Sequence, residues 1–175
     1  HCDQDRSQLA NATVGYMTPE ASNRALNLVA SNWRLAGILG IRSGAWLNIT
    51  TGVDNALNGQ LQQRPNQVSD DVHGAKTLNS YLNRAAFASP APGTFGDLQY
   101  RAVEGPRYWA IDMALSKIIS LGTTQSLEAR LEAFNLTNRF NWGLPATNLS
   151  QSQFGRITTN GGTPRILQFG LKYGF

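Results

Sequence analysis

Cysteine, histidine and charged side chains are all scarce in this sequence of 175 residues. Its one cysteine, Cys2, cannot form an internal disulfide. Charged residues make up 15%, against the roughly 25% that is typical of soluble domains. No run of apolar residues approaches the ~18 that a membrane helix requires, so a helical membrane protein is excluded. Hydrophobic residues still reach 41%, and this combination suits apolar residues that are spread thinly along strands.

Positive charge is scattered along the chain rather than gathered in a block. The formal net charge of +4 arises from 12 Arg and 3 Lys against 11 acidic residues. A nucleic-acid-binding surface needs a clustered basic face with interleaved aromatic rings. We therefore expect no nucleic-acid partner.

The sequence also shows no motif of a catalytic or metal centre. A G-x-S-x-G motif is absent, and Ser43 is followed directly by Gly44. Asp70, Asp71 and His73 are cation ligands by residue type, but three such residues in one solvent loop are usually only solvated. We therefore expect that the protein is not an enzyme and holds neither a cofactor nor a metal.

The last segment of the chain shows the clearest pattern. Within residues 165–175, apolar and polar or small residues alternate strictly, and the apolar ones are Leu167, Phe169, Leu171, Tyr173 and Phe175. A period of two predicts a strand with one apolar face.

Four further segments alternate in the same way, and one of them is ambiguous. Residues 126–137 begin with good helix formers, yet the turn at 122–125 between two alternating runs favours a hairpin. An antiparallel, up-and-down, all-β fold of about five strands is predicted, with strands near 9–17, 33–50, 107–121, 126–137 and 165–175. Strands of about this length cross a bilayer when they are tilted.

The connections between these strands are very unequal. The turn at 122–125 is tight, whereas the loops 53–106 and 142–164 are long and rich in polar and turn residues. Outer-membrane barrels show this asymmetry, with short periplasmic turns and long extracellular loops. The connection 18–32 is longer than a turn, and we interpret it as a short helix at the periplasmic rim. An up-and-down chain places four aromatic rings at that membrane face, as an interfacial girdle requires: Tyr16, Trp33, Tyr173 and Phe175.

Two alternatives stay open at this point. A soluble β-sandwich binding module also buries one face of each strand, so alternation does not separate it from a barrel. A small autonomous outer-membrane barrel would need at least three more strands within 53–106.

The sequence resembles the C-terminal part of a TonB-dependent outer-membrane receptor, in the Oar-like branch that carries a carboxypeptidase-regulatory-like domain. The resemblance covers most of the chain and lies in seven segments: residues 32–44, 58–68, 82–98, 105–117, 130–143, 154–158 and 164–175. The chain departs from the family pattern at Ala45-Trp46, where a small residue followed by Pro is common.

The resemblance implies energy-coupled uptake of a scarce substrate across the bacterial outer membrane. Receptors of this kind have a barrel of about 22 strands around a plug domain, and a TonB-type energiser displaces the plug from the periplasm. The expected partners are outer-membrane lipid, the rest of the same receptor, the energiser and the barrel-assembly machinery. Because the chain begins with His1, we expect a fragment whose plug and N-terminal domains lie elsewhere.

The resemblance also gives roles to individual residues. The expected signal for the barrel-assembly machinery comprises Phe169, Leu171, Tyr173 and Phe175. The residues expected to face lipid are Leu127, Leu131, Leu167, Phe169 and Leu171. The residues expected to face the lumen are Glu128, Arg130, Glu132, Gln168 and Lys172. The sequence does not identify substrate-binding residues.

Overall fold

The computed structural model describes residues 5–175, apart from the side chain of Arg24. His1 and Cys2 lie outside the described residues. The described chain is almost entirely strand and loop, with one helix, α1 (Arg24–Ala30), and one 3₁₀ turn, η1 (Arg84–Ala86). Its strands are β1 (Leu9–Met17), β2 (Trp33–Arg42), β3 (Trp46–Leu47), β4 (Asn66–Gln67), β5 (His73–Thr77), β6 (Ser80–Leu82), β7 (Phe87–Ala88), β8 (Val103–Glu104), β9 (Tyr108–Ser120), β10 (Ser126–Phe134) and β11 (Ile166–Gly174). No helix among these residues has the length and apolar character to cross a membrane.

The chain forms two compact units, which we describe separately. The strand unit comprises Leu9–Ile41, Trp109–Phe140 and Thr163–Phe175. The loop unit comprises the described residues 5–8 together with Arg42–Tyr108 and Asn141–Gly162.

The strand unit is one five-stranded sheet with the order β1-β2-β9-β10-β11. β10 pairs antiparallel with both of its neighbours, so that Leu131 lies opposite Leu115 on β9 and opposite Phe169 on β11. Each strand is hydrogen-bonded to the strand before it in the sheet, as in an up-and-down meander. The all-β, antiparallel fold class expected from alternation is confirmed.

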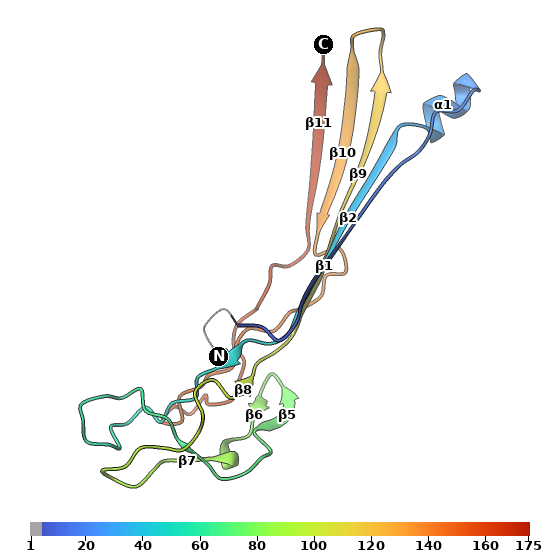
Figure 1. The fold of residues 1–175 in the computed structure, drawn as a ribbon. Helices are drawn as coiled ribbons and strands as arrows, with labels where there is room; N and C mark the ends of the chain where they lie inside the picture. The colour runs from blue at the N-terminus through green and yellow to red at the C-terminus, as the bar shows by residue number, and fades with distance from the viewer. Residues whose placement is uncertain (1–4) are drawn as a thin grey trace. The chain divides into compact units, whose positions relative to one another are not determined.

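One end of this sheet carries the short connections. The tight turn between β9 and β10 is closed by a hydrogen bond from Leu121 N to Gln125 O (2.9 Å). Figure 1 shows this turn, α1 and the C-terminus at the same end of the sheet. The long connections leave from the other end, after Arg42 on β2 and after Phe134 on β10.

The predicted strand at 33–50 is wrong beyond Arg42. Ser43 N donates to Gln8 O (2.9 Å), and Gly44 N donates to the Glu104 carboxylate (3.0 Å). Gly44 also approaches Gly105 so closely that an added Cβ would lie 1.9 Å from its carbonyl oxygen. The chain therefore leaves the sheet here, and Trp46–Leu47 pairs instead with Val103–Glu104 as β3 and β8. The predicted strand at 126–137 likewise ends at Phe134, because Asn135 adopts φ 48°.

The long loop expected at 53–106 has structure of its own. Its strands have two to five residues and form separate two-stranded sheets, β4 with β7 and β5 with β6. None of them joins the five-stranded sheet in the described chain. The strands that a small autonomous barrel would need within 53–106 are therefore not there.

A hydrophobic core holds the loop unit together. The side chains come from both long connections, and the buried members are Leu47, Ile49, Tyr81, Leu82, Ala86, Phe87, Leu98, Val103, Leu149, Phe154 and Ile157. Phe87 and Phe154 meet edge to face, with ring centroids 5.8 Å apart. Tyr81 makes a similar contact with Trp142 at 6.3 Å. Burial, together with the nearby Glu104 carboxylate, raises the pKa of Tyr81 to about 12.

Backbone hydrogen bonds join the same two connections. Tyr81 N and Leu82 N both donate to Gly155 O (2.8 and 3.3 Å). Gly155 has φ +78°, and an added Cβ would lie 2.7 Å from Leu82 O, so only glycine fits here. The segments 43–107 and 141–162 are thus parts of one folded body rather than independent loops.

A compact turn around Asp54 includes the first part of residues 58–68, one of the segments that resemble the receptor family. The Asp54 carboxylate accepts hydrogen bonds from Gly59 N (2.7 Å), Asn58 N (3.0 Å) and the Gln63 side-chain amide (2.8 Å). These bonds, that from Gly59 above all, hold the pKa of Asp54 below its ordinary value.

We predict that the loop unit loses stability when its aromatic contact is removed. Phe87→Ala should cost about 3–5 kcal/mol, because a buried ring is deleted from a packed core. The readout is hydrogen exchange of backbone amides bonded to segments of the core, such as Val68 N, which donates to Ala86 O next to Phe87. Phe95→Ala is the matched control, since Phe95 is 72% exposed whereas Phe87 is 6% exposed. Equal protection in the two variants would contradict the prediction.

Candidate membrane-facing surface

The register of the sheet gathers the apolar residues on one face. Directly opposed residues of an antiparallel pair project to the same side. Leu127 therefore shares a face with Ile119 and Tyr173, and Ala133 shares it with Met113 and Leu167. The expected lipid-facing residues all lie on this face, which we call the apolar face: Leu127, Leu131, Leu167, Phe169 and Leu171.

The neighbours of Gly37 show that the apolar face extends across β2 and β1. A Cβ added at Gly37 would lie 3.2 Å from Val14 Cγ1 on β1 and 3.7 Å from Met113 Cγ on β9. The three positions are therefore neighbours across three strands. The alternating apolar residues of β1 and β2 thus join those of β9, β10 and β11.

Large apolar side chains on this face lack protein cover within the described chain. Phe169 is 86% exposed and Leu171 is 73% exposed. Exposed apolar side chains gathered in this way mark contact with a partner or a membrane. Two later residues are exposed as well: Tyr173 is half exposed, and Phe175 is almost fully exposed.

The expected aromatic girdle lies at one end of the sheet. Tyr16 stands near the end of β1, Trp33 begins β2, and Tyr173 stands near the end of β11. Phe175 follows at the C-terminus, and its ring centroid lies 6.1 Å from that of Tyr173. These residues lie at the same end of one sheet, although β11 is at the opposite edge from β1, and a common level is what an interfacial position requires.

The opposite face of the sheet carries the charged residues, although Ile118, Phe134 and Ile166 also lie on it. Glu128 lies across from Lys172, and Glu132 lies across from Gln168. Arg130 Nη2 and Glu132 Oε1 form an ion pair at 2.6 Å, with the Arg130 side chain 52% exposed. An exposed pair of this kind contributes little to stability, so its importance lies in the polar character that it gives the surface. That this face lines a lumen stays a prediction.

Lys117 is the exception on the apolar face, and it was missed by the sequence-based assignment of faces. It lies opposite Ala129 and two residues after Leu115. A period of two from Leu115 therefore already indicated that Lys117 is on the apolar face. The side chain is 9% exposed, its amine donates to Ser31 O, and it lies 5.5 Å from the Trp33 ring centroid. The amine is therefore hydrogen-bonded near the end of the sheet rather than exposed on its apolar face.

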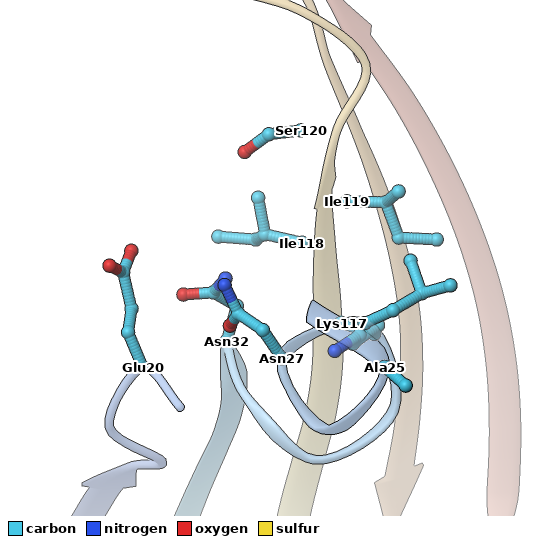
Figure 2. Close-up of a pocket in the computed structure, with 9 residues that line it drawn as sticks. Glu20, Ala25, Asn27, Asn32, Lys117, Ile118, Ile119 and Ser120 are labelled. Atoms are coloured by element: carbon cyan, nitrogen blue, oxygen red, sulfur yellow. The ribbon is translucent and has the colours of Figure 1, made fainter. Parts of the chain in front are cut away.

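A pocket of about 550 Å³ lies next to Lys117, between α1 and the end of β9 (Figure 2). The α1 side of the pocket includes Ala25, Asn27 and Leu28, and the β9 side runs from Lys117 to Ser120. Asn23 caps α1 through its side-chain oxygen, which accepts from Ala25 N (2.9 Å). The lining is mixed and open, and it contains no arrangement of catalytic groups that we can identify.

Asn135 organises the other end of the sheet, and the sequence analysis gave it no role. Its side-chain amide donates to Arg139 O and to Thr163 O, both at 2.9 Å, and its backbone N donates to Asp112 Oδ1 (2.8 Å). One buried asparagine thus ties the ends of β9, β10 and β11 together. Its left-handed conformation is one that Asn tolerates better than most residues, which was the available signal.

The candidate cation ligands of the loop unit do not form a cluster. His73 Nε2 lies 2.9 Å from Glu104 O, and its ring packs against Tyr81 at 5.5 Å. Asp70 and Asp71 are exposed. Across residues 5–175, no three such side chains stand close enough to hold an ion.

The facing of β11 gives a direct prediction. Phe169→Lys places a charge on the apolar face and should cost about 2–4 kcal/mol if that residue lies near a bilayer midplane. Gln168→Lys is the matched control, because it adds the same charge one residue away on the polar face. The measurement is the fraction of each variant that assembles in the outer membrane as a heat-modifiable band. Equal assembly of the two variants would show that the facing is wrong.

Comparison with known protein families agrees with this geometry. A family model described as an outer membrane beta barrel domain matches residues 1–168. The comparison with curated proteins gave no match, and neither did the comparison with solved structures. A barrel of this kind is embedded in bacterial outer-membrane lipid, to which it must present an apolar surface. The chain therefore belongs to the outer membrane beta barrel domain family, and its place is the bacterial outer membrane.

Proposed function

We propose that this chain forms one wall of an energy-coupled receptor that takes up a scarce substrate, of the TonB-dependent, Oar-like kind. The observation that carries this proposal is the loop unit. Two connections of the barrel wall fold around a shared core of eleven buried residues, whereas a strand connection can be as short as the turn between β9 and β10. Large folded loops suit the capture of a ligand, so we propose transport rather than catalysis.

The strand unit supports a barrel that is larger than this chain. Five strands do not close a barrel, since the smallest outer-membrane barrels have about eight. Both edges of the sheet, β1 and β11, would expose unpaired backbone groups to lipid unless further strands cover them. We propose that the rest of the same receptor supplies these strands and the plug.

The polar face then has a place within the barrel. Glu128, Arg130, Glu132, Gln168 and Lys172 would line the lumen, where charged side chains are hydrated or contact the plug. A TonB-type energiser would act on the plug, outside this sequence. The loop unit would lie on the extracellular side, because long connections of outer-membrane barrels are extracellular.

The size of the native polypeptide tests this proposal first. An antibody to this segment should detect, in outer-membrane fractions, a band several times larger than 19.1 kDa whose mobility changes on boiling. A membrane band of about 19.1 kDa would contradict the larger receptor.

Growth of deletion strains tests the uptake itself. Deleting the gene should slow growth when the transported nutrient is limiting, and deleting the energiser should cause the same defect. Because both act in one step, the double deletion should be no slower than either single one. A panel of limiting nutrients in which only the energiser deletion slows growth would argue against uptake.

The C-terminal residues give a separate prediction about assembly. We propose that Phe169, Leu171, Tyr173 and Phe175 form the signal read by the barrel-assembly machinery. Deleting Phe175 removes a ring that is 95% exposed and has no role in a core, so stability effects should be small. The expected result is a severalfold lower amount in the outer membrane, measured by fractionation. Full insertion of the truncated protein would remove this residue from the signal.

A further inference from the structure

The helix α1 has an apolar side that no described residue covers. At 100° per residue, Leu26, Val29 and Ala30 project to one side, and Asn27 and Leu28 project to the other. Leu26 is 58% exposed and Val29 is 70% exposed. The segment from Ala25 to Trp33 contains no Asp, Glu, Lys or Arg. An exposed surface helix in water normally carries charge on its outer side, and Leu26, Val29 and Ala30 supply none.

The length of α1 makes this exposure significant. A helix of seven residues is unstable in water on its own and must be held by its surroundings. Four contacts of the described residues hold its ends: the Asn23 cap, the hydrogen bond from Trp33 Nε1 to Val29 O (2.8 Å), the bond from Ala21 N to Ser31 Oγ (2.9 Å), and the bond from the Lys117 amine to Ser31 O. None of these contacts covers Leu26 or Val29.

The helix α1 lies beside one end of the apolar face of the sheet. Ile118 N donates to Asn32 O (3.1 Å), so the last residues of β9 extend beyond the start of β2. α1 occupies the space beside this extension, as the shared pocket shows (Figure 2). At the same level, Ile119 lies opposite Leu127, which lies opposite Tyr173, and all three belong to the apolar face. The helix is therefore next to the rim of the lipid-contacting surface.

We propose that α1 is an interfacial helix whose side bearing Leu26 and Val29 is inserted into phospholipid, at the boundary between headgroups and acyl chains of the inner leaflet. The proposal rests on the orientation given under the proposed function, in which the apolar face contacts lipid and this end of the sheet is periplasmic. The Trp33 indole suits the same layer, because it has an apolar body and a polar N–H group. In this proposal the pocket side, which carries Glu20, Asn27 and Asn32 together with the exposed Leu28, faces water.

Lipid accounts for the observations better than a protein partner does. The side of α1 with Leu26 and Val29 carries no charged residue, as contact with acyl chains requires. It is also continuous with a surface that already contacts lipid in a barrel of this family. Insertion of an amphipathic helix at the interface is favourable in proportion to the apolar area that it buries.

Spin labels on the whole outer-membrane protein that contains this chain test the proposal. Single cysteines replace Leu26, Leu28, Val29 or Phe169 in a Cys2→Ser background, and each carries a nitroxide. The ratio of collision rates with oxygen and with a water-soluble nickel chelate reports immersion in lipid. A heat-modifiable band for each variant shows that it has folded.

Leu28→Cys is the matched control for Leu26→Cys, because the two leucines are similarly exposed (64% and 58%) on different sides of the helix. We expect a severalfold higher ratio at positions 26 and 29 than at 28, and a high ratio at 169. A high ratio at 169 with low ratios at 26 and 29 would overturn the helix proposal alone. A low ratio at 169 would overturn the lipid-facing orientation and the helix proposal with it. High ratios at 26, 28 and 29 together would overturn one-sided insertion.

Discussion

The strand unit depends on the pairing register of its five antiparallel strands. Opposed residues project to the same side, and a slip of one residue would move every apolar side chain of a strand to the polar face. The pairing of Leu131 with both Leu115 and Phe169 shows the register that aligns the apolar residues. Hydrogen bonds along the ladders also satisfy the backbone, which a strand in lipid needs because no water is present there. One arrangement thus serves both the side chains and the backbone.

The two faces of these strands were predictable from the sequence, and the ends of the strands were not. Alternation within 165–175 and the hairpin turn before residue 126 were sufficient for the faces of β10 and β11, because a period of two needs only local information. Arg42 ends β2 because Ser43 and Gly44 bond to Gln8 and Glu104, which are distant in the chain. Asn135 ends β10 through bonds to Asp112 and Thr163. Contacts of this kind leave no periodic signal in the sequence.

The loop unit escaped prediction for a related reason. Its strands are as short as two residues, as in β4 and β7, and a pair of residues has no detectable alternation. Its core forms only when segments about 70 residues apart meet, as when Leu82 N bonds to Gly155 O. Polar composition in 53–106 was therefore interpreted as irregular loop, although it contains Phe87 and Leu98 within a packed core.

Lys117 shows how the end of the sheet reconciles charge with an apolar face. In hydrocarbon, an unpaired amine would be costly, and the position opposite Ala129 would need an apolar residue. Here the amine lies between the carbonyl of Ser31 and the ring of Trp33. Ser31 belongs to the connection that contains α1, and Trp33 directly follows that connection. A cation is tolerated because this connection folds back over it. The same contact fixes the helix beside β9, so the position of Lys117 and that of α1 have one physical cause.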